Sequence, residues 1–263
     1  MRRRGLLLAG WLSAIPAGLA AQNIASRVAA APDAEVHFSF AARAGICGDG
    51  RSVIRNDKHG IWMSRRTFLT DDSDGETCPC DAGPVRVTLT VRDHRVTEVE
   101  TQVGGKGGLG RSEIDLGLVS TASAVRYLID LAESNREAGV NAVFPTVLAD
   151  SVVVWPDLLR LARNSRLRRE TRNQAIFWLG QAAGEAATRG LDSLATDTKG
   201  DRELRKQAVF ALSQRPQSEG VPILIRLART DRDPEIRRDA LFWLGQSTDP
   251  RALDLFEELL LRH

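Results

Sequence analysis

The chain has 263 residues, with charged residues at 27% of positions and a formal net charge of +2. This length leaves room for about two domains. Residues 151–263 contain 19 Lys and Arg against 16 Asp and Glu. Such a mixed-sign surface lacks the strong basic footprint of a nucleic-acid binder, so nucleic acid is excluded as the expected partner.

The N-terminus has the pattern of a cleavable signal peptide over residues 1–21. Three arginines at residues 2–4 precede an apolar stretch that ends in small residues, which predicts cleavage near Ala20 or Ala21. An uncleaved anchor helix is the alternative, and Pro16 within the apolar stretch disfavours it. We therefore expect an exported protein, periplasmic or secreted, with no stable membrane insertion after cleavage. Loss of the three arginines changes the net charge from +2 to −1.

Three cysteines are present, at Cys47, Cys78 and Cys80. A disulfide is the default outside the cytoplasm. Cys78 and Cys80 are too close in sequence for a relaxed mutual bridge, so we expect Cys47 to pair with Cys80, or with Cys78 as the alternative partner. A metal or redox site is disfavoured, because no histidine lies at ligand spacing and no C-x-x-C is present.

Residues 33–118 predict a small antiparallel β module. Alternating apolar residues from Val36 to Phe40 indicate a half-buried strand, and residues 84–103 read as a β-hairpin around Asp93 and His94. Shorter strands are expected at residues 52–55 and 61–64, followed by a polar loop at 70–83. One face of the sheet should pack against the helices that follow.

Three local patterns point to chemistry, and each has a simpler interpretation. Residues 106–112 resemble a phosphate-binding loop, but Arg111 replaces the second lysine and no α/β sheet follows. The acidic residues of 71–76 lack the spacing of an EF-hand. The four histidines are scattered: His37, His59, His94 and His263. The sequence thus predicts no catalytic residues, no metal site and no cofactor.

The second half of the chain is repetitive. Residues 175–181 (AIFWLGQ), 208–214 (AVFALSQ) and 240–246 (ALFWLGQ) recur at spacings of 33 and 32 residues, and a weaker copy occupies 142–148. Periods of this length indicate stacked supersecondary units. The apolar residues of each copy fall on helical faces, and a second register marks a preceding helix at Leu161, Leu194 and Leu227.

We therefore predict an α+β protein in which residues 119–263 form an α-α solenoid of about four two-helix repeats. Pro145 occupies the tryptophan position of the first unit and should kink or shorten that helix. Asp233, Pro234 and Glu235 mark a helix start. Residues 251–262 should form a last, capping helix whose charged side chains solvate the open end.

The repeat, with E-x-R-x-x-A-[IVL]-F-W-L-G-Q at 170–181 and 235–246, resembles bacterial HEAT repeats of the phycobilisome-lyase type, which have an armadillo-like helical fold. The whole arrangement is similar to secreted bacterial HEAT-repeat proteins with a small cysteine-bearing front module. Some related enzymes hold iron through His-Glu pairs, but this chain has no His-Glu dipeptide. Lyase activity is likewise not implied, because fold does not transfer function.

The repeats also carry basic residues in register, at Arg172, Arg205 and Arg237, with Lys206 and Arg238 beside the last two. In the resembling repeats the second helices line the concave face, so these residues are candidates for a binding ladder. The alternative is that each arginine pairs with a neighbouring acid and links adjacent repeats.

The absence of a catalytic pattern favours a non-catalytic interaction scaffold that binds a protein or peptide through the solenoid. The alternative is an envelope enzyme or ligand-binding protein with a site at the junction of the β module and the solenoid, from Cys78 or Cys80, His59, Asp81 and Lys106. Trp178 and Trp243 are expected to be core residues, with exposure in a groove as the alternative.

Overall fold

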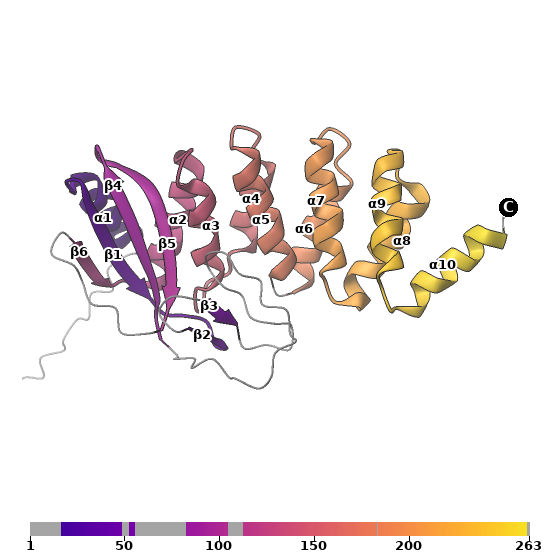
Figure 1. Cartoon of the computed structure of the whole chain (residues 1–263), viewed down its shortest axis with the longest axis horizontal. Helices are drawn as coiled ribbons and strands as arrows, with labels where there is room; N and C mark the ends of the chain where they lie inside the picture. Colours follow the sequence, from indigo (N-terminus) through magenta and orange to yellow (C-terminus); the bar gives the residue numbers. More distant parts are fainter. Residues whose placement is uncertain (1–16, 49–52, 56–82, 105–112, 183, 262–263) are drawn as a thin grey trace, which may run out of the picture.

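The computed structural model describes residues 17–48, 53–55, 83–104, 113–182 and 184–261. A helix and a small sheet at one end are followed by a row of helix pairs that runs to the C-terminus (Figure 1). This arrangement confirms the predicted class, an α+β chain in which a β module precedes an α-solenoid.

Helix α1 (Ala17–Ala30) leads into the sheet. The main sheet has the order β5-β4-β1-β6, and its strands are β1 (Ala34–Phe40), β4 (Val85–Arg92), β5 (Arg95–Val103) and β6 (Glu113–Leu118). Two short strands, β2 (Ile46–Gly48) and β3 (Val53–Arg55), pair separately. The predicted strand at 61–64 lies outside the described residues.

The predicted hairpin is present as β4 and β5, joined by a two-residue turn. Asp93 and His94 have φ values of 48° and 58°, as a hairpin turn of the mirror-image type requires at both central positions. Alternate β4 residues from Val85 to Val91 are fully buried, so one face of the hairpin belongs to the core.

The sheet is mixed rather than purely antiparallel, which corrects the expectation. β1 pairs antiparallel with β4 but parallel with β6, with Glu35 opposite Glu113 and Val36 opposite Ile114. An alternating sequence pattern sets which face of a strand is buried, but it carries no information on strand direction. β6 lies at the edge of the sheet opposite to β5, and its partner β1 is distant in the sequence, so no local pattern indicated the parallel pairing.

Helix α1 was not expected from the sequence. Its Ile24 and Val28, with the following Ala31, are nearly fully buried, and the helix packs against the first solenoid helix on one side of the sheet (Figure 1). Their spacing of four and three residues is the amphipathic signal that identifies such a helix.

The solenoid contains four helix pairs and one further helix. The first helices are α2 (Thr121–Ser134), α4 (Trp155–Arg163), α6 (Glu185–Ala195) and α8 (Gln217–Thr230). The second helices are α3 (Gly139–Val147), α5 (Arg169–Gln181), α7 (Arg202–Ser213) and α9 (Pro234–Gly245), after which α10 (Pro250–Leu261) follows. Helix α3 has nine residues and contains Pro145, in agreement with the predicted shortening.

The capping residues explain where two of the second helices begin. The carboxylate of Asp201 accepts from the Glu203 backbone N–H at 3.0 Å, and that of Asp233 accepts from Glu235 at the same distance. Each satisfies one of the otherwise unpaired N–H groups of the first helical turn. The predicted start at Asp233 is therefore confirmed.

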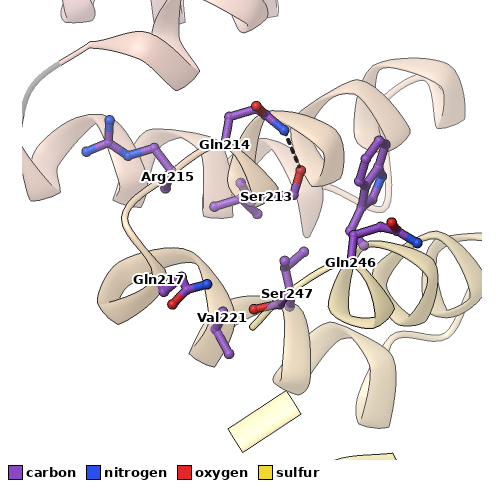
Figure 2. Close-up of a pocket in the computed structure, with 10 residues that line it drawn as sticks. Ser213, Gln214, Arg215, Gln217, Val221, Gln246 and Ser247 are labelled. Carbon is purple, nitrogen blue, oxygen red and sulfur yellow. Dashed lines mark hydrogen bonds between the residues drawn. The ribbon is translucent and has the colours of Figure 1, made fainter. Parts of the chain in front are cut away.

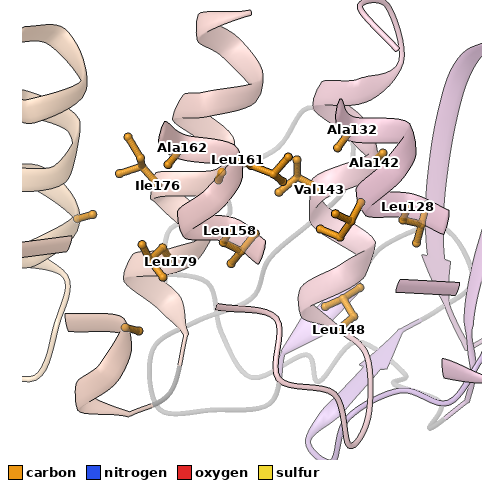
Figure 3. Close-up of a cluster of buried hydrophobic side chains, with 14 of the residues drawn as sticks. Leu128, Ala132, Ala142, Val143, Leu148, Leu158, Leu161, Ala162, Ile176 and Leu179 are labelled. Carbon is orange, nitrogen blue, oxygen red and sulfur yellow. The ribbon is translucent and has the colours of Figure 1, made fainter. Parts of the chain in front are cut away.

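One hydrophobic core runs from the sheet into the repeats. Phe38 of β1 meets Tyr127 of α2 edge-on, with ring centroids 6.1 Å apart. The next layer is formed by leucines such as Leu158 and Leu161 of α4 with Leu179 of α5, all fully buried (Figure 3). The sheet thus packs on the first repeat, as predicted.

Candidate functional site

The second helices form the more tightly packed row of the array. Adjacent second helices contact one another far more extensively than adjacent first helices do. Their outer surface, which we call the second-helix face, carries side chains in the Gln174, Phe177, Trp178 and Gln181 registers. Because the helices approach closely, these side chains from neighbouring repeats form one continuous surface.

Aromatic pairs span successive repeats on this face. Phe144 of α3 stacks on Trp178 of α5, with ring centroids 4.9 Å apart and 29° between the planes. Phe210 of α7 lies 5.0 Å from Trp243 of α9, tilted by 51°. Both tryptophans are only partly buried, although they pack against the core. The two tryptophans therefore lie between the expected core position and the alternative of exposure in a groove. They pack against the core and also contribute to the surface.

The series of pairs is interrupted at the third repeat, where Ala211 occupies the tryptophan register. A Cβ added at Gly180 would lie 3.0 Å from the Cβ of Ala211, so the backbones of α5 and α7 are in close approach there. A tryptophan at residue 211 has no room, because Ala211 is itself 1% exposed. The interruption divides the face into two aromatic sites.

A hollow of about 170 Å³ adjoins the second aromatic site (Figure 2). It lies between the turn after α7 and the turn after α9, with Trp243 as one wall and Gln214, Gln217 and Gln246 around it. The Gln214 amide donates to the Ser213 hydroxyl at 3.1 Å. Side-chain amides offer both donors and acceptors, so this hollow suits a neutral hydrogen-bonding group such as a peptide unit.

The three arginines in register all bond to the backbone of the preceding helix or loop. Arg172 Nε donates to the Ala162 carbonyl at 3.0 Å, and Arg205 Nε donates to the equivalent Ala195 carbonyl at 2.7 Å. Arg237 Nη1 donates to the Asp231 carbonyl at 2.8 Å. These bonds satisfy carbonyls at or just beyond the end of the first helix, which have no partner within the helix.

Arg205 is also in an almost fully buried ion pair with Asp231 of the next repeat, at 2.6 Å. Lys206 and Arg238 are more exposed; Lys206 lies 3.7 Å from Asp239, and Arg238 lies 2.8 Å from Glu235. This geometry supports the linking alternative for Arg205 and for Arg172, which lies 3.8 Å from Asp201 of the next repeat. Arg237 instead bonds to carbonyls of its own repeat. A binding role stays a prediction, and Lys206 and Arg238 are better placed for it.

A second buried arginine was not singled out from the sequence. Arg215, which follows α7, is 8% exposed. Its guanidinium donates to Thr188 at 2.8 Å, to Glu219 at 2.9 Å and to three backbone carbonyls of the α5–α6 connection, those of Gly180, Ala182 and Gly184. The side chain thus joins parts of the second, third and fourth repeats. No repeat register marks it, since Ala182 and Ser247 occupy the equivalent positions.

The carboxylate beside Arg215 is electrostatically stabilised. Hydrogen bonds from the Thr188 hydroxyl and from Arg215 lower the pKa of Glu219 below its usual value, because both favour the charged form. Asp249 at the next turn is held in the same way: hydrogen bonds from Arg251 lower the pKa of Asp249 to about 2. Both are structural ion pairs in the connections between repeats.

Several predicted groups lie outside the described residues. These are Cys78, Cys80, His59, Asp81, Lys106 and the acidic residues of 71–76. The backbone of Cys47 lies in β2, and its disulfide stays a prediction. The alternative site at the junction of the β module and the solenoid therefore stays a prediction.

The two described histidines make local contacts. His37 Nδ1 lies 3.0 Å from the Thr88 hydroxyl, and His94 Nδ1 lies 3.1 Å from the Ala29 carbonyl. Across the described parts of the chain, His, Cys, Asp and Glu form no group of three or more that could hold a metal ion. No helix within those same ranges is long and apolar enough to cross a membrane.

Comparison with known families identifies the repeat. The family model for HEAT repeats matches residues 193–263, which extend from the end of α6 to the C-terminus. The match supports a HEAT-repeat protein and agrees with the helix pairs described above. A search of the curated proteins finds no match to the chain.

Proposed function

We propose that this protein is an exported, non-catalytic scaffold that binds a protein or peptide through the second-helix face. The observation that carries the proposal is the pair of aromatic sites on that face, Phe144 with Trp178 and Phe210 with Trp243. Partly exposed aromatic side chains are enriched among the residues that dominate binding energy. HEAT repeats commonly act as protein-interaction scaffolds, which is consistent with this role.

The second aromatic site is the better candidate for contact with a peptide backbone. Gln214 and Gln246 lie beside Trp243 around the hollow of Figure 2, and both residues are exposed. An apolar partner side chain would contact the indole while the amides pair with its backbone. We therefore expect this site to contribute more to affinity than the arginine register.

The position of α1 is compatible with the proposed cleavage near Ala20 or Ala21, although the helix itself begins at Ala17. Its buried residues Ile24 and Val28 lie on the C-terminal side of that position. A cut there would leave the contacts of α1 with the core in the mature protein. Intact-mass measurement of the protein purified from an exported fraction tests this part of the proposal.

The binding experiment compares photo-crosslinking at two exposed positions, with a crosslinking amino acid placed at Gln214 or, as the control, at Ser218 on first helix α8. In envelope extract, we expect one partner to crosslink through Gln214 and not through Ser218. A matched pull-down uses Gln214→Arg against Ser218→Arg. Equal capture by both variants, with no crosslink specific to Gln214, would contradict binding at this face.

Reversal of the three register arginines would be a poor test of binding. Arg205 is 5% exposed and is paired with Asp231, so its reversal would leave a buried carboxylate beside a new negative charge. Loss of partner capture would then report unfolding. The exposed Arg238 is the appropriate residue for a charge-reversal test in this register.

A further inference from the structure

Among the described residues, α9 and α10 leave an apolar surface uncovered at the end of the array where α10 lies (Figure 1). Phe242 of α9 is 57% exposed, while Leu253 and Leu260 of α10 are 60% and 78% exposed. We call this the open-end surface; it comprises Leu241, Phe242, Gly245, Leu253, Phe256 and Leu260. Contiguous exposed apolar residues mark an interaction site more often than scattered ones do.

Helix α10 has the register of the first helix of another repeat. Leu253 lies as many residues after Gln246 as Thr188 lies after Gln181 and Val221 after Gln214. Thr188 and Val221 are each 4% exposed. Leu260 corresponds in the same way to Ala195, which is fully buried. In the preceding repeat, Arg205 of second helix α7 donates to Ala195. Thr188 is held by Arg215 directly after α7 and by Glu219 of α8. Among the described residues no second helix covers α10.

Helix α9 presents the same surface as α5, which is covered. The two helices share the sequence A-[IL]-F-W-L-G-Q. Ile176 of α5 is 1% exposed, whereas its counterpart Leu241 is only partly buried. Gly180 lies against Ala211 of α7, whereas the nearest described atom outside helix α9 to a Cβ added at Gly245 is the Phe256 Cζ, at 3.9 Å. The helix that covers α5 is α7, so the open-end surface fits a helix of the same kind.

The charged residues of α10 indicate which charge a helix that covers this surface should carry. Asp254 and Glu257 are exposed on α10, and the C-terminal end of a helix carries partial negative charge. In the covered repeat, Arg205 of α7 supplies the positive charge and donates to the last residue of α6, Ala195. The exposed cation of α10, Arg251, is held by Asp249, so a second copy of α10 would bring further exposed acids to this surface. A basic helix is therefore the complementary occupant.

We propose that the open-end surface binds one basic amphipathic α-helix of a partner protein, with the chemistry of α7. Small apolar residues of that helix would pack against Gly245 and Phe242, and its apolar stripe would cover Leu253 and Leu260. An arginine near its N-terminal end would bond to the carbonyls at the end of α10. This interface continues the contact that joins the repeats to one another, and it adjoins the hollow beside Gln214 at Phe242, whose ring lies against Trp243.

The test uses a labelled peptide with the sequence of residues 201–214, which contains α7, titrated against the full chain by fluorescence anisotropy. We expect saturable binding that is weakened at least about tenfold by Leu260→Asp and by Phe242→Asp, because each places a charge in the apolar contact. The matched control is Leu118→Asp, since Leu118 is 75% exposed on β6 and should leave binding unchanged. A peptide with Ala208→Glu should bind about tenfold more weakly than the parent peptide.

A free peptide must fold on binding, which weakens its affinity. The same peptide is therefore also joined behind His263 through a flexible Gly/Ser linker, which raises its effective concentration. We expect the extended chain to melt at a higher temperature than the parent, and Leu260→Asp to remove the increase. No binding and no increase would overturn the proposal, as would binding unaffected by Leu260→Asp. A dimer in sedimentation that Leu260→Asp dissociates would assign the surface to a second copy and overturn it too.

Discussion

The phenyl ring of Phe144 stacks on the indole of Trp178 at a centroid distance of 4.9 Å, although the two residues belong to different repeats. The same relationship joins Phe210 to Trp243. The repeat period thus places a phenylalanine of one second helix against the tryptophan of the next. These contacts couple neighbouring repeats. In a solenoid each repeat contacts only the repeats next to it.

Trp178→Ala is expected to lower the free energy of unfolding by about 2–4 kcal/mol. A buried aromatic truncated to alanine loses about 3–5 kcal/mol, and the partial exposure of Trp178 reduces this value. Urea unfolding followed by circular dichroism measures the change. Leu118→Ala is the control and should change stability by less than about 0.5 kcal/mol, because Leu118 is 75% exposed.

A double-mutant cycle separates the stacking from general packing. Phe144→Ala and Trp178→Ala together should be less destabilising than the sum of the two single changes, with a coupling of about 0.5–1.5 kcal/mol. Additive effects would show that the two rings contribute independently, and the coupling between repeats would then have to come from other contacts.

Repetition made the helical half predictable. The recurring apolar residues identified the helix pairs, the start at Asp233 and the short helix at Pro145 from the sequence alone. The degree of burial of Trp178 could not be predicted. Periodicity shows which face of a helix a residue lies on, but it does not give the distance to the neighbouring helix. The β module was less predictable, since the parallel partner of β1 is β6, about 80 residues away.

Gly180→Ala and Gly245→Ala should change stability in opposite directions. The new methyl group at residue 180 would meet Ala211 at 3.0 Å, and overpacking of this kind destabilises by about 1–3 kcal/mol. At residue 245 the nearest atom is 3.9 Å away, so the higher helix propensity of alanine should stabilise by up to about 1 kcal/mol. Thermal and urea unfolding of the two variants test the prediction, which equal effects would contradict.

The different surroundings of Gly180 and Gly245 could not be predicted from the sequence. Gly180 and Gly245 occupy the same position in almost identical heptapeptides. Only the neighbour differs, because α7 lies against the first glycine and no described helix lies against the second. The sequence alone predicted a capping helix with charged residues at this end. The structure adds that the same helix, α10, leaves Leu253 and Leu260 exposed.

Arg215→Met should be one of the most destabilising single changes on the solenoid, with a loss of about 3–5 kcal/mol. Removal of this buried cation leaves Glu219 without its cationic partner and removes the donor to the carbonyls of Gly180 in α5 and of Gly184 before α6. The matched control is Arg189→Met, which removes an exposed pair with Glu185 and should change stability by about 0–1 kcal/mol. Similar losses in the two variants would contradict the assigned role.

The two arginine sets differ in how far the sequence revealed them. The register of Arg172, Arg205 and Arg237 is visible as a period, and the structure adds that their guanidinium groups bond to backbone carbonyls. Arg215 has no counterpart in the other repeats, so no periodic signal marks it. Its partners come from three separate elements, and only their packing brings them together.

The ion pair of Glu219 predicts a specific acid sensitivity. Its pKa is lower in the folded protein than in the unfolded chain, because Thr188 and Arg215 donate to the carboxylate. The folded state is therefore favoured above the ordinary glutamate pKa of about 4.5, and this contribution disappears as the pH falls through the lowered value. Glu219→Gln should be less stable than the wild type near pH 7, and the difference should shrink as the pH falls below the ordinary glutamate pKa of about 4.5.

Asp249 provides the comparison, since hydrogen bonds from Arg251 lower its pKa to about 2. The stability difference between Asp249→Asn and the wild type should therefore persist at a pH where that of Glu219→Gln has already decreased. Urea midpoints for the three proteins between about pH 2 and pH 7 compare the two titrations. A difference for Glu219→Gln that stays constant over this range would show that the carboxylate titrates alike in the folded and unfolded chain.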